Sequence, residues 1–293
     1  MVRRNAVPVA PMVVQWAVLG ALLGALAPGL GELGGVARLA GFLVAVACAG
    51  GGWVLLARAL ARRGRRGLGP ADLVTVTRGT LACVVAALTT SSLLGPTVAG
   101  TSVGAATVGG ATEAGLAGSV LRSPLVALAS VALALDAVDG WVARRTGTAT
   151  SLGARLDMEV DAFLILVLSI AAAQLLGWWV LAIGLFRYAL VAATWVAPWL
   201  GGSVPPSYWR KAIAALQGIV LTLATADVLP RPVLTGAVAA ALVLLAWSFG
   251  TQGAELWQAR ARRPAWPTAR RTVARRPAPG VDEGHGQRVG VSP

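Results

Sequence analysis

Residues 136–161 read DAVDGWVARRTGTATSLGARLDMEVD and carry four of the seven aspartates of the chain. Asp136 and Asp139 are three residues apart, and Asp157 and Asp161 are four apart. Each pair therefore shares one face of a helix. A turn midway between the pairs brings them to the same depth, so the segment predicts a helical hairpin whose two packed helices, about 8–10 Å apart, let four carboxylates converge.

The chain around this segment is strongly apolar. Hydrophobic residues make up 56% of its 293 residues and charged residues 13%, where soluble domains carry about 25% charged residues. Several uncharged runs exceed the roughly 18 residues that cross a bilayer as a helix. They are residues 5–31, 39–57, 79–112, 162–186, 188–209 and 232–254. The runs lack the alternation of a β-barrel, so the pattern predicts an all-α integral membrane protein.

We expect eight membrane helices, two followed by six. Their expected ranges are 12–30, 38–58, 73–95, 122–144, 151–176, 179–200, 211–228 and 232–252. The chain then divides into an N-terminal helix pair with a basic loop (1–66), a six-helix core (67–252) and a basic tail (253–293). A Gly/Thr/Ala/Ser-rich loop is expected at 96–121, and the Arg/Pro/Gly-rich tail is expected to be disordered.

Basic residues predict the orientation in the membrane. With the N-terminus in the cytoplasm, nineteen basic residues lie inside and only Arg38, Arg122 and Arg231 lie outside, as the positive-inside bias requires. This places the aspartate hairpin on the cytoplasmic side of a multi-pass protein of the cell membrane. Arginines in short clusters between apolar runs do not form a nucleic-acid face, so we expect the lipid bilayer as partner and no nucleic acid. The clusters either determine topology or also bind anionic lipid.

Four aspartates in a membrane need a positive partner. Each costs about 2.5–3.5 kcal/mol at the centre of a membrane helix, and the four repel one another. Hard oxygen ligands suit Mg²⁺ or Mn²⁺, and four carboxylates have room for two ions, an arrangement that recurs in phosphoryl transfer. Two alternatives remain on spacing alone. One is a buried network in which Arg144, Arg145 and Arg155 pair with the aspartates, and the other is a cation transporter that uses them as its ion site.

The residues of the hairpin follow the pattern D-x2-D-G-x2-A-R-x8-G-x3-D-x3-D without departure. This pattern resembles the signature of the CDP-alcohol phosphatidyltransferases, and the region from about 70 to 252 looks like the six-helix core of that family. The resemblance implies transfer of a phosphatidyl, or phospho-alcohol, group from a CDP-linked donor such as CDP-diacylglycerol to an acceptor alcohol, with release of CMP, in phospholipid biosynthesis. The matched Ala143-Arg144, the eight-residue spacer and Gly153 favour this enzyme over a transporter, which needs none of them.

The resemblance also implies roles for single residues. Asp136, Asp139 and Asp157 would be metal ligands, and Asp161 would be a ligand, the general base, or both. The small residues beside the carboxylates let a nucleotide approach closely. Together with one arginine they would line the CDP pocket, a set formed by Gly140, Ala143, Arg144 and Gly153.

Asp72, Thr75 and Arg78 form a weaker upstream match at helical spacing on one face. They are candidates for contact with CDP. The alternative is that Asp72 caps the helix N-terminus and Arg78 extends to the membrane interface.

The acceptor is left open among glycerol 3-phosphate, an inositol phosphate, phosphatidylglycerol and other alcohols or phospho-alcohols. Arg187 falls inside a membrane helix, where a charge needs a reason. With Arg210 and Lys211 it is a candidate for binding a phosphate, or it pairs with an aspartate or a carbonyl. A homodimer is possible from the family resemblance.

Overall fold

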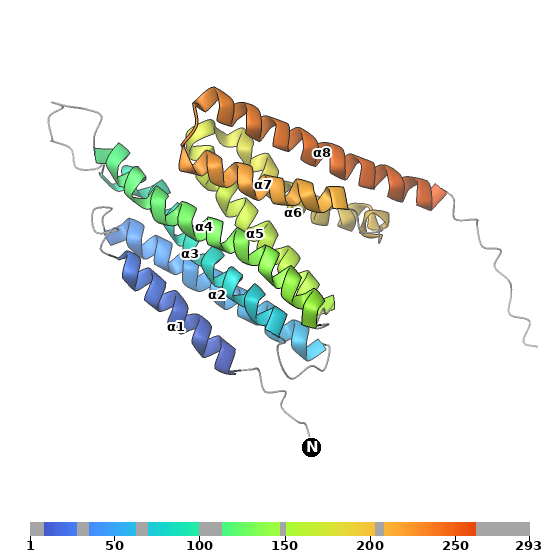
Figure 1. The fold of residues 1–293 in the computed structure, drawn as a ribbon, viewed down its shortest axis with the longest axis horizontal. Helices are drawn as coiled ribbons and strands as arrows, with labels where there is room; N and C mark the ends of the chain where they lie inside the picture. The colour runs from blue at the N-terminus through green and yellow to red at the C-terminus, as the bar shows by residue number, and fades with distance from the viewer. Residues whose placement is uncertain are drawn as a thin grey trace, which may run out of the picture.

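The computed structural model describes residues 9–27, 35–62, 70–99, 113–146, 151–202 and 208–261 of the chain. Within these ranges every regular element is helical, which confirms the all-α fold class. Figure 1 shows the helices as one elongated bundle with α1 at one edge and α8 at the other. The α-helices are α1 Val9–Leu26, α2 Gly35–Arg62, α3 Pro70–Ala99, α4 Glu113–Thr146, α5 Ser151–Leu176, α6 Leu181–Val196, α7 Tyr208–Ala226 and α8 Arg231–Ala261.

Six of these helices are long and apolar enough to cross a membrane, which makes the chain a multi-pass membrane protein. The expectation of eight spans differs at two helices of the described part, the shorter apolar helix α1 and helix α7, whose first turn carries Arg210 and Lys211. α7 buries polar groups, and several of them donate hydrogen bonds within the protein, although the Gln217 Oε1 has no partner in the described part of the chain. The Gln217 amide donates to Ala241 O at 2.8 Å, and Thr222 and Thr225 donate to carbonyls one turn back. These polar groups lie on the buried face of α7, while its exposed face carries apolar residues such as Ile219 and Leu223.

α3 is the central helix of the bundle. It packs against α1, α2, α4 and α5, and residues 80–89 are buried on all sides. α5 in turn packs against α3, α6 and α7. A helix buried all round reads as continuously apolar, which explains the long uncharged run after Arg78. The position of α3 decides which side chains reach the aspartates of the neighbouring helices.

α2 binds to α3 through small residues. Its buried positions recur every four residues as Ala37, Gly41, Ala45 and Ala49, continued by Trp53. A Cβ placed on Gly41 would lie 2.6 Å from the carbonyl oxygen of Ala87 in α3, and Ser91 of α3 donates to Ala37 O at 3.2 Å. Membrane helices associate by this kind of close backbone approach because lipid supplies no hydrophobic drive between them.

The two helices of the aspartate hairpin are joined through a third helix, α3. α4 ends at Thr146 and α5 begins at Ser151, in agreement with a turn between them. Among the residues whose side chains the structure describes, α4 and α5 make little contact with each other, and both pack against α3 and α7. Most residues near the turn, between 139 and 152, lie outside that part, so direct packing of the two helices there stays a prediction. α3 holds them together along one side of the hairpin.

Several helix ends differ from the expected ranges, and three of them change the picture of the loops. α3 continues to Ala99, α4 begins at Glu113 rather than near 122, and α8 continues to Ala261. The loop predicted at 96–121 is thus helical at both of its ends. Its Gly, Ser and Ala content indicated a loop, but these residues are well tolerated in membrane helices, where helical hydrogen bonds satisfy the backbone. The tail expected to be disordered lies, from residue 262, outside the described residues.

The close approach at Gly41 is testable. Gly41→Val should lower the free energy of unfolding by about 1–3 kcal/mol because the added isopropyl group collides with the α3 backbone. Gly50→Val is the matched control, since a Cβ on Gly50 of the same helix meets no atom within 4 Å. Thermal unfolding in detergent measures both variants. Equal midpoints for the two would contradict the packing of α2 on α3 described above.

Candidate active site

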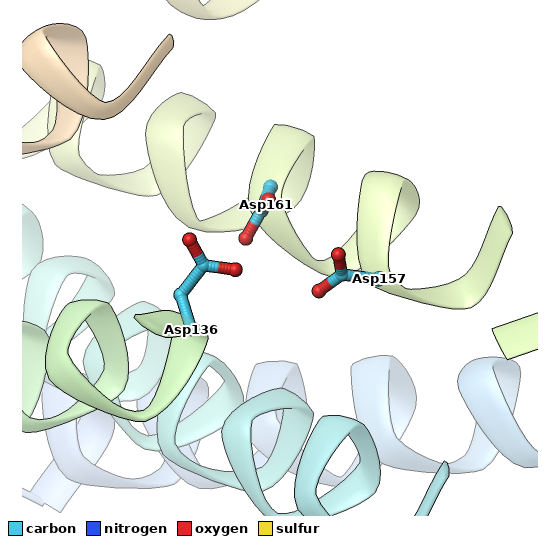
Figure 2. A group of neighbouring side chains, drawn as sticks. All are labelled: Asp136, Asp157 and Asp161. Carbon is cyan, nitrogen blue, oxygen red and sulfur yellow. The ribbon is translucent and has the colours of Figure 1, made fainter. Parts of the chain in front are cut away.

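Three of the four signature aspartates meet in space. Asp136 comes from α4, and Asp157 and Asp161 come from successive turns of α5 (Figure 2). One carboxylate oxygen of each lies within 4.8 Å of the others. Their side chains are 36–40% exposed, so the cluster is open on one side. This convergence agrees with the depth expected from the hairpin spacing.

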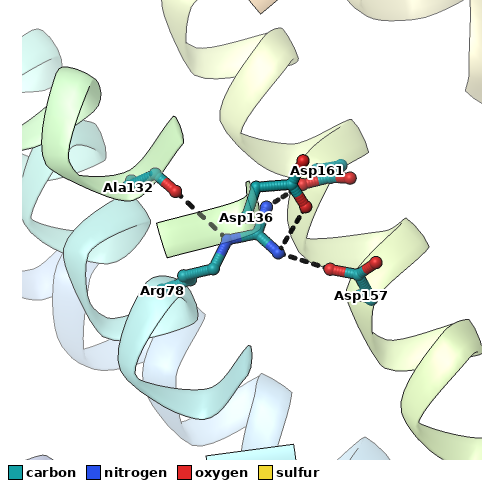
Figure 3. A network of polar contacts seen from close by, with 5 residues as sticks. All are labelled: Arg78, Ala132, Asp136, Asp157 and Asp161. Atoms are coloured by element: carbon teal, nitrogen blue, oxygen red, sulfur yellow. Dashed lines mark hydrogen bonds and ion pairs between the residues drawn. The ribbon is translucent and has the colours of Figure 1, made fainter. Parts of the chain in front are cut away.

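A buried guanidinium group closes the other side of the cluster. Arg78 of α3 is fully buried and reaches all three carboxylates, as Figure 3 shows. Its Nη1 pairs with Asp136 Oδ1 at 2.9 Å and donates to Asp157 Oδ1, and its Nη2 donates to Asp161 Oδ1. Its Nε donates to the carbonyl oxygen of Ala132, one turn before Asp136 in α4, at 3.2 Å. One side chain therefore links α3, α4 and α5.

Arginine suits this position for physical reasons. A charge buried among apolar helices must be paired and hydrogen-bonded. The planar guanidinium offers five donors in a fixed fork and stays ionised, so it can serve three carboxylates and a carbonyl at once. A lysine has three donors on a flexible stem and would not hold the same four acceptors in the same directions.

The upstream motif lies beside the cluster. Asp72, Thr75 and Arg78 are all buried, with exposed fractions of 2%, 4% and 0%. α3 begins at Pro70, so Asp72 lies within the first turn and is not the N-cap. Arg78 does not extend to the membrane interface either, because it points into the protein. Both alternatives considered for these residues are wrong, while their contact with CDP stays a prediction.

Other signature residues are described less completely. Gly153 lies in the first turn of α5 and is partly exposed. The backbone of residues 139–144 belongs to α4, but the side chains of Asp139, Gly140, Ala143 and Arg144 lie outside the described residues. Their predicted roles stay predictions.

The polar network expected as an alternative is present with a different cation. The guanidinium that contacts all three carboxylates belongs to Arg78, a residue outside the expected set of Arg144, Arg145 and Arg155. The sequence did contain a signal. Arg78 precedes an uncharged run of more than thirty residues and follows Asp72 and Thr75 on one face. The interaction joins residues 79 and 83 positions apart, which spacing within one segment does not reveal.

Glu159 is a site residue that the sequence analysis did not consider. Its carboxylate pairs with Arg187 of α6 at 2.5 Å, so the charge inside α6 is neutralised by α5 and not by an aspartate or a carbonyl. Arg210 lies 3.6 Å from Glu255 of α8. Both arginines therefore have acidic partners, and any phosphate would compete with them.

The three carboxylates fit a divalent cation. They present hard oxygen donors, which Mg²⁺ and Mn²⁺ prefer. Three carboxylates against one guanidinium leave two negative charges in the cluster, and the donor atoms are close enough for one small ion to reach several of them. A carboxylate has two acceptor oxygens, and the contacts to Arg78 each use Oδ1.

Comparison with known families identifies the class of protein. The family model of the CDP-alcohol phosphatidyltransferases matches residues 70–252 of the 293. The chain belongs to this family, which confirms the resemblance seen in the hairpin signature. No curated protein and no solved structure matches the chain. Membership establishes an enzyme of CDP-alcohol phosphotransfer in phospholipid synthesis, and the matched region begins at the first residue of α3.

Arg78 should act as a fixed counter-ion for the carboxylates. Arg78→Met should lower the free energy of unfolding by about 3 kcal/mol in chelator, because three carboxylates lose their common partner. Mg²⁺ should then raise the unfolding temperature of the variant more than that of the wild type, since the cation replaces the missing charge. Thermal unfolding with EDTA and with Mg²⁺ measures both effects.

Arg155→Met is the control for this prediction, because Arg155 lies on the same helix as Asp157 but is exposed. It should behave as the wild type in both conditions. An Arg78→Met variant with wild-type stability in EDTA would show that the guanidinium does not hold the cluster.

Proposed function

We propose that the chain transfers a phosphatidyl group from CDP-diacylglycerol to an acceptor alcohol in a reaction that depends on a divalent cation. The observation that carries the proposal is the convergence of Asp136, Asp157 and Asp161 within a member of the CDP-alcohol phosphatidyltransferase family. The open side of the cluster is where the diphosphate of the donor would bind. The acceptor is an alcohol or phospho-alcohol whose identity a substrate panel would decide.

The carboxylates of Asp136 and Asp157 would hold the cation, with Asp139 as a further ligand and Asp161 shared between binding and proton transfer. When bound, Mg²⁺ or Mn²⁺ neutralises the diphosphate oxygens and makes the phosphorus a better electrophile. Two ions would agree with the number of acidic groups in the signature. Gly140, Ala143, Arg144 and Gly153 would form the CDP pocket.

Asp161 would serve as the general base. The acceptor hydroxyl oxygen attacks the β-phosphorus of the donor, and its proton passes to the Asp161 carboxylate. The bond from the β-phosphorus to the oxygen that bridges it to the α-phosphorus breaks, and CMP leaves with that oxygen. A phosphodiester remains on the acceptor, so atoms and charges balance without a redox step.

Arg78 would orient the base and the ligands. Its two terminal nitrogens contact Asp161 and Asp157 on one helix and Asp136 on the other. The same guanidinium lowers the repulsion among the carboxylates before a cation arrives. Asp72 and Thr75, buried on the same face of α3, would complete the wall of the site toward the nucleotide.

The setting of the enzyme is part of the proposal. The N-terminal pair of helices (1–66) and the basic tail (253–293) would flank a catalytic core (67–252) in the cell membrane. The active site would face the cytoplasm, as the distribution of the basic residues predicts. We also propose that the protein forms a homodimer, as the family resemblance implies.

Cation dependence is the first test of this function. Purified full-length protein should release CMP from CDP-diacylglycerol with at least one acceptor of a panel, and excess EDTA should abolish the release. Asp157→Asn should lower turnover at least about 100-fold, since even outer-shell changes at metal sites cost 10–100-fold. Asp227→Asn is the matched control, because Asp227 pairs with Arg122 at 3.1 Å away from the cluster. Release of CMP that persists in EDTA would refute the mechanism.

Asp161→Asn separates the base from the ligands. The variant should retain donor binding and lose turnover, since the amide keeps the shape of the carboxylate but accepts no proton at neutral pH. Donor affinity is measured by calorimetry with CDP-diacylglycerol and Mg²⁺, and turnover by CMP release. A loss of donor binding as large as in Asp157→Asn would make Asp161 a ligand only.

A further inference from the structure

An apolar cavity of about 440 Å³ lies between α2 and the catalytic core. α3 contributes Thr75, Val76 and Gly79 to its wall, and α5 contributes Leu156 and Val160. Its volume is in the range of sites for small organic ligands, which are apolar with few polar groups. α2 precedes the region matched by the family model, so this wall is a feature that the family core alone does not supply.

The cavity and the carboxylate cluster share two helices at the same depth. On α5, Leu156 and Val160 line the cavity, and each directly precedes an aspartate of the cluster, Asp157 or Asp161. On α3, Thr75 lines the cavity one turn before Arg78. The helices α3 and α5 therefore contribute to both features: one face of the pair holds the carboxylate cluster with Arg78, and a neighbouring face forms part of the cavity wall. From Leu156 to the deepest lining residue of α5, the cavity extends about 10 Å along the helix.

The cavity is open toward the surroundings of the bundle. Gly51 and Gly52 of α2 line it and are exposed, and Leu55 beside them is 65% exposed. A Cβ on either glycine would meet no atom within 4 Å. In a membrane, these open sides face lipid. A hydrocarbon chain therefore has a lateral entrance that does not pass through water.

One polar group in the lining points to the kind of ligand. Trp53 is 6% exposed, and its indole Nε1 has no hydrogen-bond partner in the described part of the chain. A buried indole N–H usually donates a hydrogen bond to an acceptor, because a buried donor without a hydrogen bond costs free energy. An ester carbonyl at the head of an acyl chain supplies such an acceptor. The methylene groups that follow it would lie along a mostly apolar wall, which also contains Gln15, Glu159 and Tyr188.

We propose that this cavity binds an acyl chain of the CDP-linked lipid donor, with Trp53 donating to its ester carbonyl. The inference rests on the proposed function, because the cluster must bind the CDP diphosphate of the same molecule. The N-terminal helix α2 then acts as a specificity element that favours long-chain donors. The glycines at 51 and 52 leave space for the chain where a larger side chain would fill it.

The test uses the full-length protein and two donors, CDP-dioleoylglycerol and CDP-dihexanoylglycerol. The double variant Gly51→Leu/Gly52→Leu should raise KM for the long-chain donor at least about tenfold, the effect of losing two buried methylene groups. KM for the short-chain donor and kcat for both should stay within about twofold of the wild type, since the cluster is unchanged. Gly50→Leu is the matched control, because Gly50 is outside the lining and its Cβ also meets open space.

A second readout does not need turnover. CDP-diacylglycerol with a photoactivatable diazirine in one acyl chain should form adducts on residues 47–56 of α2 in the wild type and in Gly50→Leu, and lose them in the double variant. Equal effects of the double variant on long and short donors, or adducts that spare α2, would overturn the inference. Absence of CMP release from either donor in the wild type would instead refute the proposed function, and the cross-linking would still report on the cavity.

Discussion

A guanidinium group buried where three membrane helices meet is tolerated only if carboxylates and carbonyls surround it. Arg78 meets this condition through Asp136, Asp157, Asp161 and the carbonyl oxygen of Ala132. The requirement fixes the relative depth of α3, α4 and α5, because a shift of one turn would separate a charge from its partner at high cost in a membrane. It also explains why α4 and α5 can carry the cluster with little direct contact between their described residues.

The sequence predicted the parts of this arrangement that depend on local spacing. The i, i+3 and i, i+4 pairs and the short turn were sufficient to place Asp136 level with Asp161, and the uncharged runs were sufficient for the helices. The sequence did not predict the role of Arg78, because its contacts with Asp157 and Asp161 join segments about eighty residues apart. Spacing within the hairpin does not reveal that α3 packs against both α4 and α5. For the same reason Glu159 was overlooked as the partner of Arg187. Helix ends were missed where Gly and Ser, loop residues in water, continue a helix in lipid.

α2 uses two kinds of small residue for two purposes. Ala37, Gly41, Ala45 and Ala49 let its backbone approach α3, and this contact positions the rest of the helix. Beyond these positions, Gly51 and Gly52 line a cavity, and a Cβ added to either glycine would meet no atom within 4 Å. A helix with larger residues at these two positions would bind α3 equally well but would fill the space beside the site. The packing of α2 and the volume of the cavity are therefore separable properties of one helix.

The permanent counter-ion and a divalent cation have complementary tasks in such a site. Without Arg78, three carboxylates in a partly apolar setting would repel one another and separate whenever the cation dissociates. With it, the three described carboxylates still outnumber the guanidinium, so the cluster would attract a divalent ion. The guanidinium lies on the buried side and the carboxylates are 36–40% exposed on the other, so a divalent cation would approach them from the open side. The carboxylates are thus held in position before the donor and its cation bind, so little of the binding free energy is spent on ordering them.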